Sequence, residues 1–309
     1  MKRPYRILFI FIFAVIFTLA AAIYWIVPIL SVKVNSSISS LFMADHSSDS
    51  LLECESFNIN KKFVSKFNFE TSNGASISVL KVSAIDSLRN QGTIIFSHGI
   101  RRSKEIFYPL ASYYSRLGFD CFSMDMRYHG ESEGDFVTYG HLERGDLKEL
   151  IDYIEKKWGI NGKLILWGQS LGAAVSLLVA AEDSRVDGVV SESSYGRFEN
   201  VAEGYFRLMA GLNFKPAENV IVKRVIGLTG LDPETVSPSI AAKRINIPVM
   251  IVHGGRDNKI NPANAYEIYS ALKNRMSSIL ILQNASHLDI WESGGDLYFR
   301  RICKFIETL

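Results

Sequence analysis

From about residue 60 to the C-terminus, short apolar runs alternate with longer stretches that repeat apolar residues every three or four positions. The short runs are typical of buried strands, and the longer repeats are typical of helices packed on one face. Regular alternation of the two predicts a mostly parallel sheet covered by helices on both faces. The expected strands are 63–70, 76–83, 93–97, 119–125, 163–167, 186–191, 247–252 and 278–283, and the expected helices are 104–117, 142–157, 173–181, 262–272 and 294–307.

The N-terminus follows a different pattern. Residues 7–30 are almost uninterrupted apolar sequence, broken only by Thr18, Tyr24, Trp25 and Pro28. About 20 apolar residues in a helix span the hydrocarbon core of a bilayer, and Tyr and Trp are enriched at its interfaces. The pattern therefore predicts a single transmembrane helix.

Basic residues flank this helix unequally. Lys2, Arg3 and Arg6 precede it, whereas only Lys33 closely follows it. Positive charge favours the cytoplasmic side, so we expect a cytoplasmic N-terminus and an extracytoplasmic body. The alternative is a cleavable signal peptide with small residues near Ala22, but apolar cores of signal peptides usually run about 7–15 residues.

The chain divides into three parts on this pattern. Residues 1–30 are the cytoplasmic N-terminus and transmembrane anchor, and residues 31–60, rich in Ser and Asp at their start, read as a flexible linker. Residues 61–309 are expected to form the folded α/β domain, in which residues 194–236 interrupt the alternation with many apolar side chains. Asn35 begins a glycosylation sequon, which matters only in a eukaryotic lumen.

Composition narrows the classes of function. The chain is 48% hydrophobic and 21% charged, which is typical of a globular protein, and its net charge is only +2. A charge this small gives no electrostatic basis for binding nucleic acid. The cysteines lack metal-ligand spacing, Cys121 fits a buried strand, and a Cys54–Cys303 disulfide stays open.

The candidate nucleophile is Ser170. It is the central residue of a G-x-S-x-G sequence at residues 168–172, with an apolar strand before it and a helix of small residues after it. Strand, sharp turn and helix form the context of a nucleophile elbow, and the amide of Leu171 at the helix start is placed to donate to an oxyanion. The alternative is an ordinary serine in a glycine-rich turn.

A serine nucleophile needs a base and an acid that orients the base, in the chain order serine, acid, histidine. Two histidines follow Ser170. His287 lies in a loop beyond the last strand and is the expected base, whereas His253 at the end of a strand is expected to be a packing residue. Asp257 follows a strand and a glycine turn and is the expected acid, with Glu192 as its rival.

Two further sequences bring in a resemblance. Residues 97–100 read Ser-His-Gly-Ile, and residues 125–132 read D-x-R-x-H-G-x-S. Together with the elbow and the Asp257/His287 pair, they resemble the α/β-hydrolase superfamily, nearest to its lipase, monoacylglycerol-lipase-like and serine-aminopeptidase-like members. The resemblance implies an α/β-hydrolase fold, the amide of Ile100 as second oxyanion donor, a structural turn at 125–132 and a cap over the active site at 194–236.

The expected function is that of a membrane-anchored serine hydrolase of a carboxylic ester, working through an acyl-enzyme with the triad Ser170, Asp257 and His287. This chemistry requires no cofactor and no metal. The expected partners are a small acyl compound, with lipid as one form, and the membrane, with no nucleic acid. Thioester or peptide hydrolysis and acyl transfer on the same triad stay open.

Overall fold

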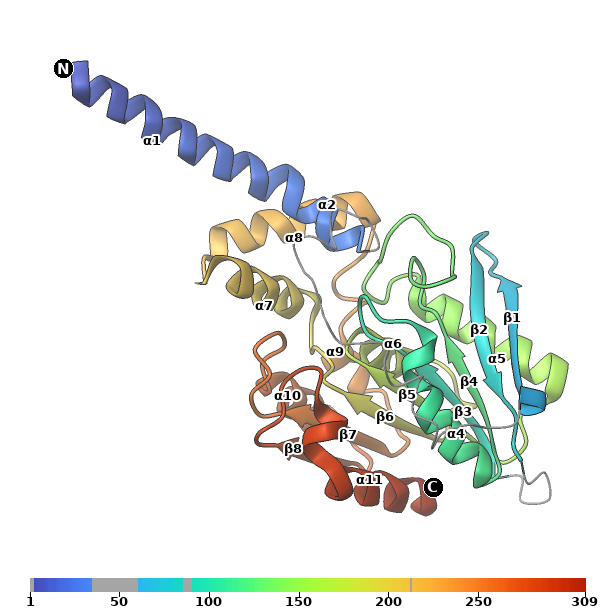
Figure 1. Ribbon diagram of the computed structural model, residues 1–309. Coiled ribbons are helices and arrows are strands. Elements are labelled where there is room, and N and C mark those ends of the chain that lie inside the picture. The colour runs from blue at the N-terminus through green and yellow to red at the C-terminus, as the bar shows by residue number, and fades with distance from the viewer. Residues whose placement is uncertain (1–2, 35–60, 86–90, 212) are drawn as a thin grey trace.

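The computed structural model describes residues 3–34, 61–85, 91–211 and 213–309. Within them the chain forms an eight-stranded sheet in the order β1-β2-β4-β3-β5-β6-β7-β8 (Figure 1). The pairs β1–β2 and β2–β4 are antiparallel, and all the others are parallel. The strands are β1 Val64–Glu70, β2 Ser76–Val82, β3 Gly92–Ser97, β4 Phe119–Met124, β5 Lys163–Gln169, β6 Gly188–Glu192, β7 Val249–Gly254 and β8 Ser278–Leu282.

All eight strands fall where the apolar runs predict them, so the predicted mostly parallel sheet is confirmed. The inner strands are buried on both faces. In β5, Leu164 and Leu166 belong to one hydrophobic cluster, while Ile165 and Trp167 belong to the other. Side chains alternate across a strand, and a parallel sheet covered on both sides therefore reads as a continuous apolar run.

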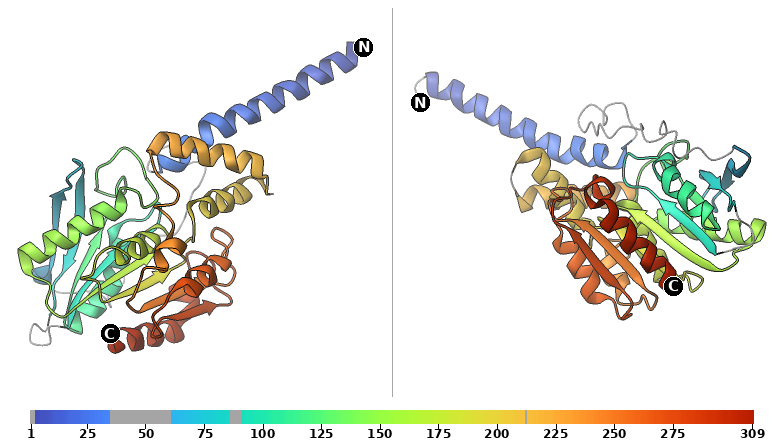
Figure 2. Two further views of the ribbon diagram at one scale, coloured as in Figure 1. Left: turned by 180° about the vertical axis from the view of Figure 1, so that it is seen from behind. Right: turned by 60° about the horizontal axis from the view of Figure 1, so that its bottom comes forward.

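Helices cover both faces of the sheet (Figures 1 and 2). One cluster takes in residues of α4 and α11, and the other takes in residues of α5, α6 and α10. The predicted helices are confirmed with small shifts at their ends, and a 3-10 turn, η5 Lys104–Phe107, precedes α4. The helices are α4 Tyr108–Arg116, α5 Glu143–Trp158, α6 Leu171–Ala180, α9 Pro238–Ala242, α10 Ala263–Ala271 and α11 Ile290–Thr308.

Two more helices, α7 Phe198–Ala210 and α8 Lys215–Thr229, lie within the range 194–236. They stand outside the two helical layers and beside the end of the N-terminal helix, as both views of Figure 2 show. We call them the α7–α8 pair. Phe198, Val201, Ile221 and Val225 are its buried contacts with the main core.

The N-terminal segment is helical throughout: α1 Arg3–Ala21, a π-helical turn η1 Ala22–Ile26 and α2 Val27–Val32. Its stretch Tyr5–Val32 has an 18-residue window of mean hydropathy 2.8, none of it buried. The length and composition suffice to cross a membrane, as do those of many signal sequences. Figure 1 shows α1 projecting away from the body.

The end of this helix, by contrast, is docked on the body. Leu30, Val32 and Val34 are buried, although the expected linker begins at residue 31. The backbone amide of Val137 donates to the carbonyl of Val32 over 3.0 Å. The rest of the expected linker, residues 35–60 with Asn35 and Cys54, lies outside the described residues.

Candidate active site

Ser170 occupies a tight turn between β5 and α6. Its backbone has φ 54° and ψ −112°, a region that costs a non-glycine residue about 1–3 kcal/mol. The turn is held at both sides, because the Ser170 amide donates to the carbonyl of Glu192 over 2.7 Å and the Ala174 amide donates to the carbonyl of Ser170 over 3.1 Å. The strained geometry of an elbow is therefore present at the predicted position.

The two glycines of the elbow are required by space. A Cβ at Gly168 would overlap the backbone of Gly172, and a Cβ at Gly172 would overlap the carbonyl oxygen of Ser97. Helix α6 can therefore start directly against the ends of β3 and β5. This close approach is the physical reason for the G-x-S-x-G sequence.

The structure brings His287 and Asp257 to Ser170. His287 Nε2 lies 3.0 Å from Ser170 Oγ, and His287 Nδ1 lies 2.6 Å from Asp257 Oδ2. Because the carboxylate only accepts, Nδ1 carries the proton and Nε2 is free to accept one from the serine hydroxyl. All three side chains follow the ends of parallel strands, β5, β7 and β8, which meet at one edge of the sheet.

Asp257 is held firmly for this task. Its side chain is buried, and its Oδ1 accepts the backbone amides of Lys259 and Ile260 over 2.9 and 2.8 Å. Its Oδ2 faces a second imidazole, since His253 Nε2 lies 3.2 Å away. Burial alone would raise the pKa of Asp257, but the hydrogen bonds from His253 and His287 hold it well below its usual range.

The contact of His253 with Asp257 was not foreseen from the sequence, which placed this histidine correctly as a buried strand-end residue. Its Nε2 also lies 3.0 Å from the carbonyl oxygen of Ile260. Both neighbours are acceptors, so Nε2 must carry a proton and donate to them. In the sequence, only the short spacing of His253 and Asp257 across a glycine turn indicated that the two side chains could meet.

The Ser-His-Gly-Ile loop lies against the elbow, since a Cβ added at Gly99 would lie 3.1 Å from Ser170 Cβ. His98 Nε2 accepts the amide of Met126 over 3.0 Å, so its Nδ1 carries the proton and donates to the carbonyl of Gly99 over 2.7 Å. Burial lowers the pKa of His98 to about 4, which keeps it neutral. The Arg102 amide donates to the same carbonyl over 3.2 Å.

These bonds also orient the next amide. The carbonyl of Gly99 and the amide of Ile100 share one trans peptide and point in opposite directions. Fixing the carbonyl therefore fixes the N–H of Ile100. The second expected donor, the Leu171 amide, belongs to the first residue of α6, where an amide has no partner inside its own helix.

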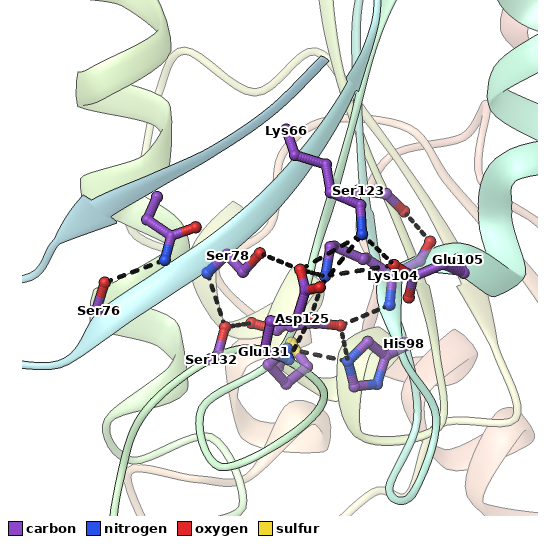
Figure 3. A network of polar contacts seen from close by, with 12 residues as sticks. Lys66, Ser76, Ser78, His98, Lys104, Glu105, Ser123, Asp125, Glu131 and Ser132 are labelled. Carbon is purple, nitrogen blue, oxygen red and sulfur yellow. Dashed lines mark hydrogen bonds and ion pairs between the residues drawn. The ribbon is translucent and has the colours of Figure 1, made fainter. Parts of the chain in front are cut away.

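A buried ionic network supports this loop (Figure 3). Lys104 is fully buried, and its Nζ lies 2.6 Å from Asp125 Oδ2 and 2.8 Å from Glu131 Oε2. Asp125 also accepts the amides of Lys104 and Glu131 over 2.7 and 2.8 Å. The residue after Asp125 is Met126, whose amide binds His98. The turn at 125–132 thus supports the neighbouring loop, in keeping with the structural role that the resemblance implies. The burial of Lys104 was not predicted from the sequence.

Glu192, the rival acid, points elsewhere. Its side chain is buried and accepts the indole N–H groups of Trp167 and Trp291 over 2.7 and 3.0 Å and the hydroxyl of Tyr298. Burial raises its pKa to about 7, although these hydrogen bonds act to lower it. Trp291 and Tyr298 belong to α11, the helix that follows the His287 loop, so Glu192 ties that helix to the sheet.

An apolar hollow lies between α2, the α7–α8 pair and the Ser-His-Gly-Ile loop. Its internal volume is about 40 Å³, it opens to solvent, and most of its lining side chains are aliphatic or aromatic. Among the described residues, no group of three or more His, Cys, Asp or Glu side chains is placed to hold a metal ion. The residues that contact this hollow include Val27, Leu30, Ile100, Phe198, Val201 and Ile221.

Comparison with known proteins agrees with this geometry. The family model for the alpha/beta hydrolase fold matches residues 92–234, which include Ser170. The uncharacterized protein YfhR of Escherichia coli O157:H7 is 27% identical over 218 residues, which cover 69% of this chain and 69% of YfhR.

Solved structures show the same fold. The Pyrococcus furiosus esterase Pf2001 superposes with a TM-score of 0.67 at 20% identity, over 81% of this chain and 94% of the esterase. Acetyl xylan esterase 1 from Thermoanaerobacterium sp. JW/SL YS485 gives a TM-score of 0.59 at 17% identity, over 81% and 85% of the two chains. With the strand order and the Ser170 elbow, these matches show that the protein has the α/β-hydrolase fold.

Proposed function

We propose that the protein is a membrane-anchored serine hydrolase that cleaves a carboxylic ester through an acyl-enzyme. One observation carries the proposal. Ser170 Oγ, His287 and Asp257 form a continuous hydrogen-bonded chain with distances of 3.0 and 2.6 Å, and the serine stands on a strained elbow. Nucleophile, base and orienting acid within hydrogen-bond reach are the arrangement that acyl transfer to serine needs.

The reaction follows from the protonation states. Ser170 Oγ attacks the acyl carbonyl carbon while its proton passes to His287 Nε2. Asp257, which stays ionised beside two imidazoles, stabilises the imidazolium that forms. His287 returns the proton to the departing alcohol, and a water molecule then attacks the acyl-enzyme by the same route in reverse.

The negative oxygen of each tetrahedral intermediate is stabilised by the amides of Ile100 and Leu171. The Ile100 amide is held by the bonds to the Gly99 carbonyl, and the Leu171 amide adds the positive end of the α6 dipole. Donors fixed in advance cost no reorganisation during the reaction, so they stabilise the transition state more than water does.

The apolar hollow supports an acyl compound with an apolar chain as substrate, with the α7–α8 pair as the cap. Its mostly apolar lining suits an alkyl chain, because ligand pockets are lined mainly by apolar side chains. The superposable Pyrococcus and Thermoanaerobacterium proteins are esterases by name, which favours an ester bond over a thioester or a peptide bond.

The N-terminal helix is the membrane anchor in this proposal, with the catalytic domain outside the cytoplasm. Lys2, Arg3 and Arg6 before the helix, against Lys33 after it, support that orientation. A tag at the C-terminus should be lost to external protease once any outer barrier is opened. A fully protected tag, or a mature N-terminus near residue 23, would contradict the anchored orientation.

The enzymatic proposal is tested with p-nitrophenyl esters of two to twelve acyl carbons, a matched thioester and a peptide amide. Wild-type protein should turn over the esters, and Ser170→Ala should lose activity by orders of magnitude, up to about 10⁶ in kcat. Ser176→Ala, a buried serine on the same α6 whose hydroxyl bonds the carbonyl of Gly172, is the control. Equal activity of Ser170→Ala and wild type would defeat the proposal.

A further inference from the structure

The end of the N-terminal helix is built into the catalytic domain. Tyr139 donates its hydroxyl to the carbonyl of Ser31 over 2.7 Å. The guanidinium of Arg224 on α8 lies 4.6 Å from the ring centre of Tyr24 and 5.0 Å from that of Trp25. Hydrogen bonds to the body and stacking on α8 fix residues 24–34 in one place.

This docked end supplies one wall of the apolar hollow. Val27 and Leu30 line it from α2 and Val34 lines it from the turn that follows, while Val201 and Ile221 line it from the α7–α8 pair. On another side the hollow reaches Ile100, whose amide is the proposed oxyanion donor. A chain lying in the hollow therefore contacts the helix and the oxyanion loop together.

The burial pattern locates the membrane surface beside the same wall. Side chains of the helix are exposed from Tyr5 to Phe17 and again at Tyr24, Trp25 and Ile26, and burial begins at Pro28. In the proposed anchored orientation, these exposed apolar side chains lie in lipid. Leu30 is six residues beyond Tyr24, about 9 Å along the axis at 1.5 Å per residue. The hollow thus lies at the outer edge of the lipid headgroup layer, which is roughly 5–7 Å thick.

From this geometry we propose that α2 is the membrane-side wall of an acyl-chain site, filled by the fatty acyl chain of a bilayer lipid ester that enters past the helix. The proposal rests on the proposed function for its reaction and for the membrane anchor, whereas binding of the chain does not require catalysis. It assigns α2 a direct role in substrate selection. The helix is therefore more than an anchor, and its lining residues set how long a chain the site accepts.

The test uses full-length protein in phosphatidylcholine vesicles and the series of p-nitrophenyl esters. Leu30→Trp narrows the hollow and should lower kcat/KM on decanoate and dodecanoate at least tenfold, since each excluded methylene costs about fourfold, while acetate changes less than twofold. Ile29→Trp is the matched control, because Ile29 is 40% exposed and does not line the hollow. Leu30→Ala should shift the preferred chain to greater length, and it keeps the test usable where the tryptophan prevents folding.

A second readout does not depend on catalysis. A fatty acid with a diazirine at its methyl end should label residues 27–34 and α7 in the Ser170→Ala protein, as located by tandem mass spectrometry, and Leu30→Trp should reduce this labelling at least fivefold. Labelling confined to α1, or chain-length profiles that are the same for Leu30→Trp and Ile29→Trp, would overturn the proposal. Activity that survives Ser170→Ala would instead defeat the proposed function and leave the labelling result standing.

Discussion

Asp257 and Asp125 are both buried carboxylates just beyond the ends of strands, yet they face opposite kinds of partner. Asp125 lies 2.6 Å from the ammonium of Lys104, which acts as a fixed positive charge. Asp257 meets two imidazoles at 2.6 and 3.2 Å, groups that can gain and lose a proton. The difference separates a carboxylate that holds a loop from one that can serve a reaction.

Loss of the hydrogen bond between Asp257 and His287 is expected to reduce activity most. Asp257→Asn places an amide against His287 Nδ1 and favours the wrong tautomer, so kcat should fall by about 10⁴. Ester hydrolysis by the purified variant measures the loss, and a thermal melt checks the fold. A mild effect here, with a 10⁴-fold loss in Glu192→Gln, would make Glu192 the acid.

Loss of the buried ion pair between Lys104 and Asp125 is expected to lower stability. Lys104→Met leaves Asp125 buried without its cation, which should lower the free energy of unfolding by about 3–5 kcal/mol. Urea denaturation measures this change. The control is Lys66→Met, because Lys66 is half exposed in its pairs with Glu105 and Glu131 and should contribute less than about 1 kcal/mol. Equal losses in the two variants would show that Lys104 is not held as described.

Glu192 is a third buried carboxyl, and it faces only neutral hydrogen-bond donors. Its pKa is raised from 4.5 to about 7, so between these values the folded state holds a proton that the unfolded chain has lost. Its contribution to stability therefore falls as pH rises through this window, by up to about 3 kcal/mol.

Unfolding free energies from pH 5 to pH 8 test this sign. Glu192→Gln cannot ionise and should remove that part of the pH dependence, although its amide also leaves one of the donors from Trp167, Trp291 or Tyr298 unpaired. A wild-type slope that the variant keeps would assign the pH dependence to another group.

The smallest effect is expected at His98, which connects the turn after Asp125 to the loop that carries the Ile100 amide. His98→Ala releases the Gly99 carbonyl from its side-chain partner and loosens the Ile100 amide, while the Arg102 amide still holds that carbonyl. We expect kcat to fall roughly 10- to 100-fold, less than the loss of a whole oxyanion donor, with KM nearly unchanged. A change confined to KM would make His98 a binding residue rather than a positioning one.

Local sequence patterns predicted most of the fold, and they predicted that three residues of the site lie close together. Apolar runs marked each strand, because strands buried on both faces leave little ambiguity, and chain order singled out Ser170, Asp257 and His287. Lys104 was missed because a lysine at the start of an amphipathic helix normally stays in water. Only the partners brought by β4 and its turn make its burial favourable.

The docked end of the N-terminal helix was missed for a different reason. Val27 and Leu30 are apolar, and lipid and protein cores accept the same apolar side chains, so composition cannot separate a segment in a bilayer from one packed on α8. The linker was expected from residue 31 because serines begin there, yet Val32 and Val34 are buried.

Covalent labelling is a direct test of whether Ser170 is the nucleophile that His287 and Asp257 activate. A fluorophosphonate probe should modify wild-type protein at Ser170, as located by mass spectrometry of the labelled peptide. Ser170→Ala should take up no label, and His287→Ala should be labelled far more slowly. Equal labelling of wild type and Ser170→Ala, or a label on another residue, would show that Ser170 is not the nucleophile.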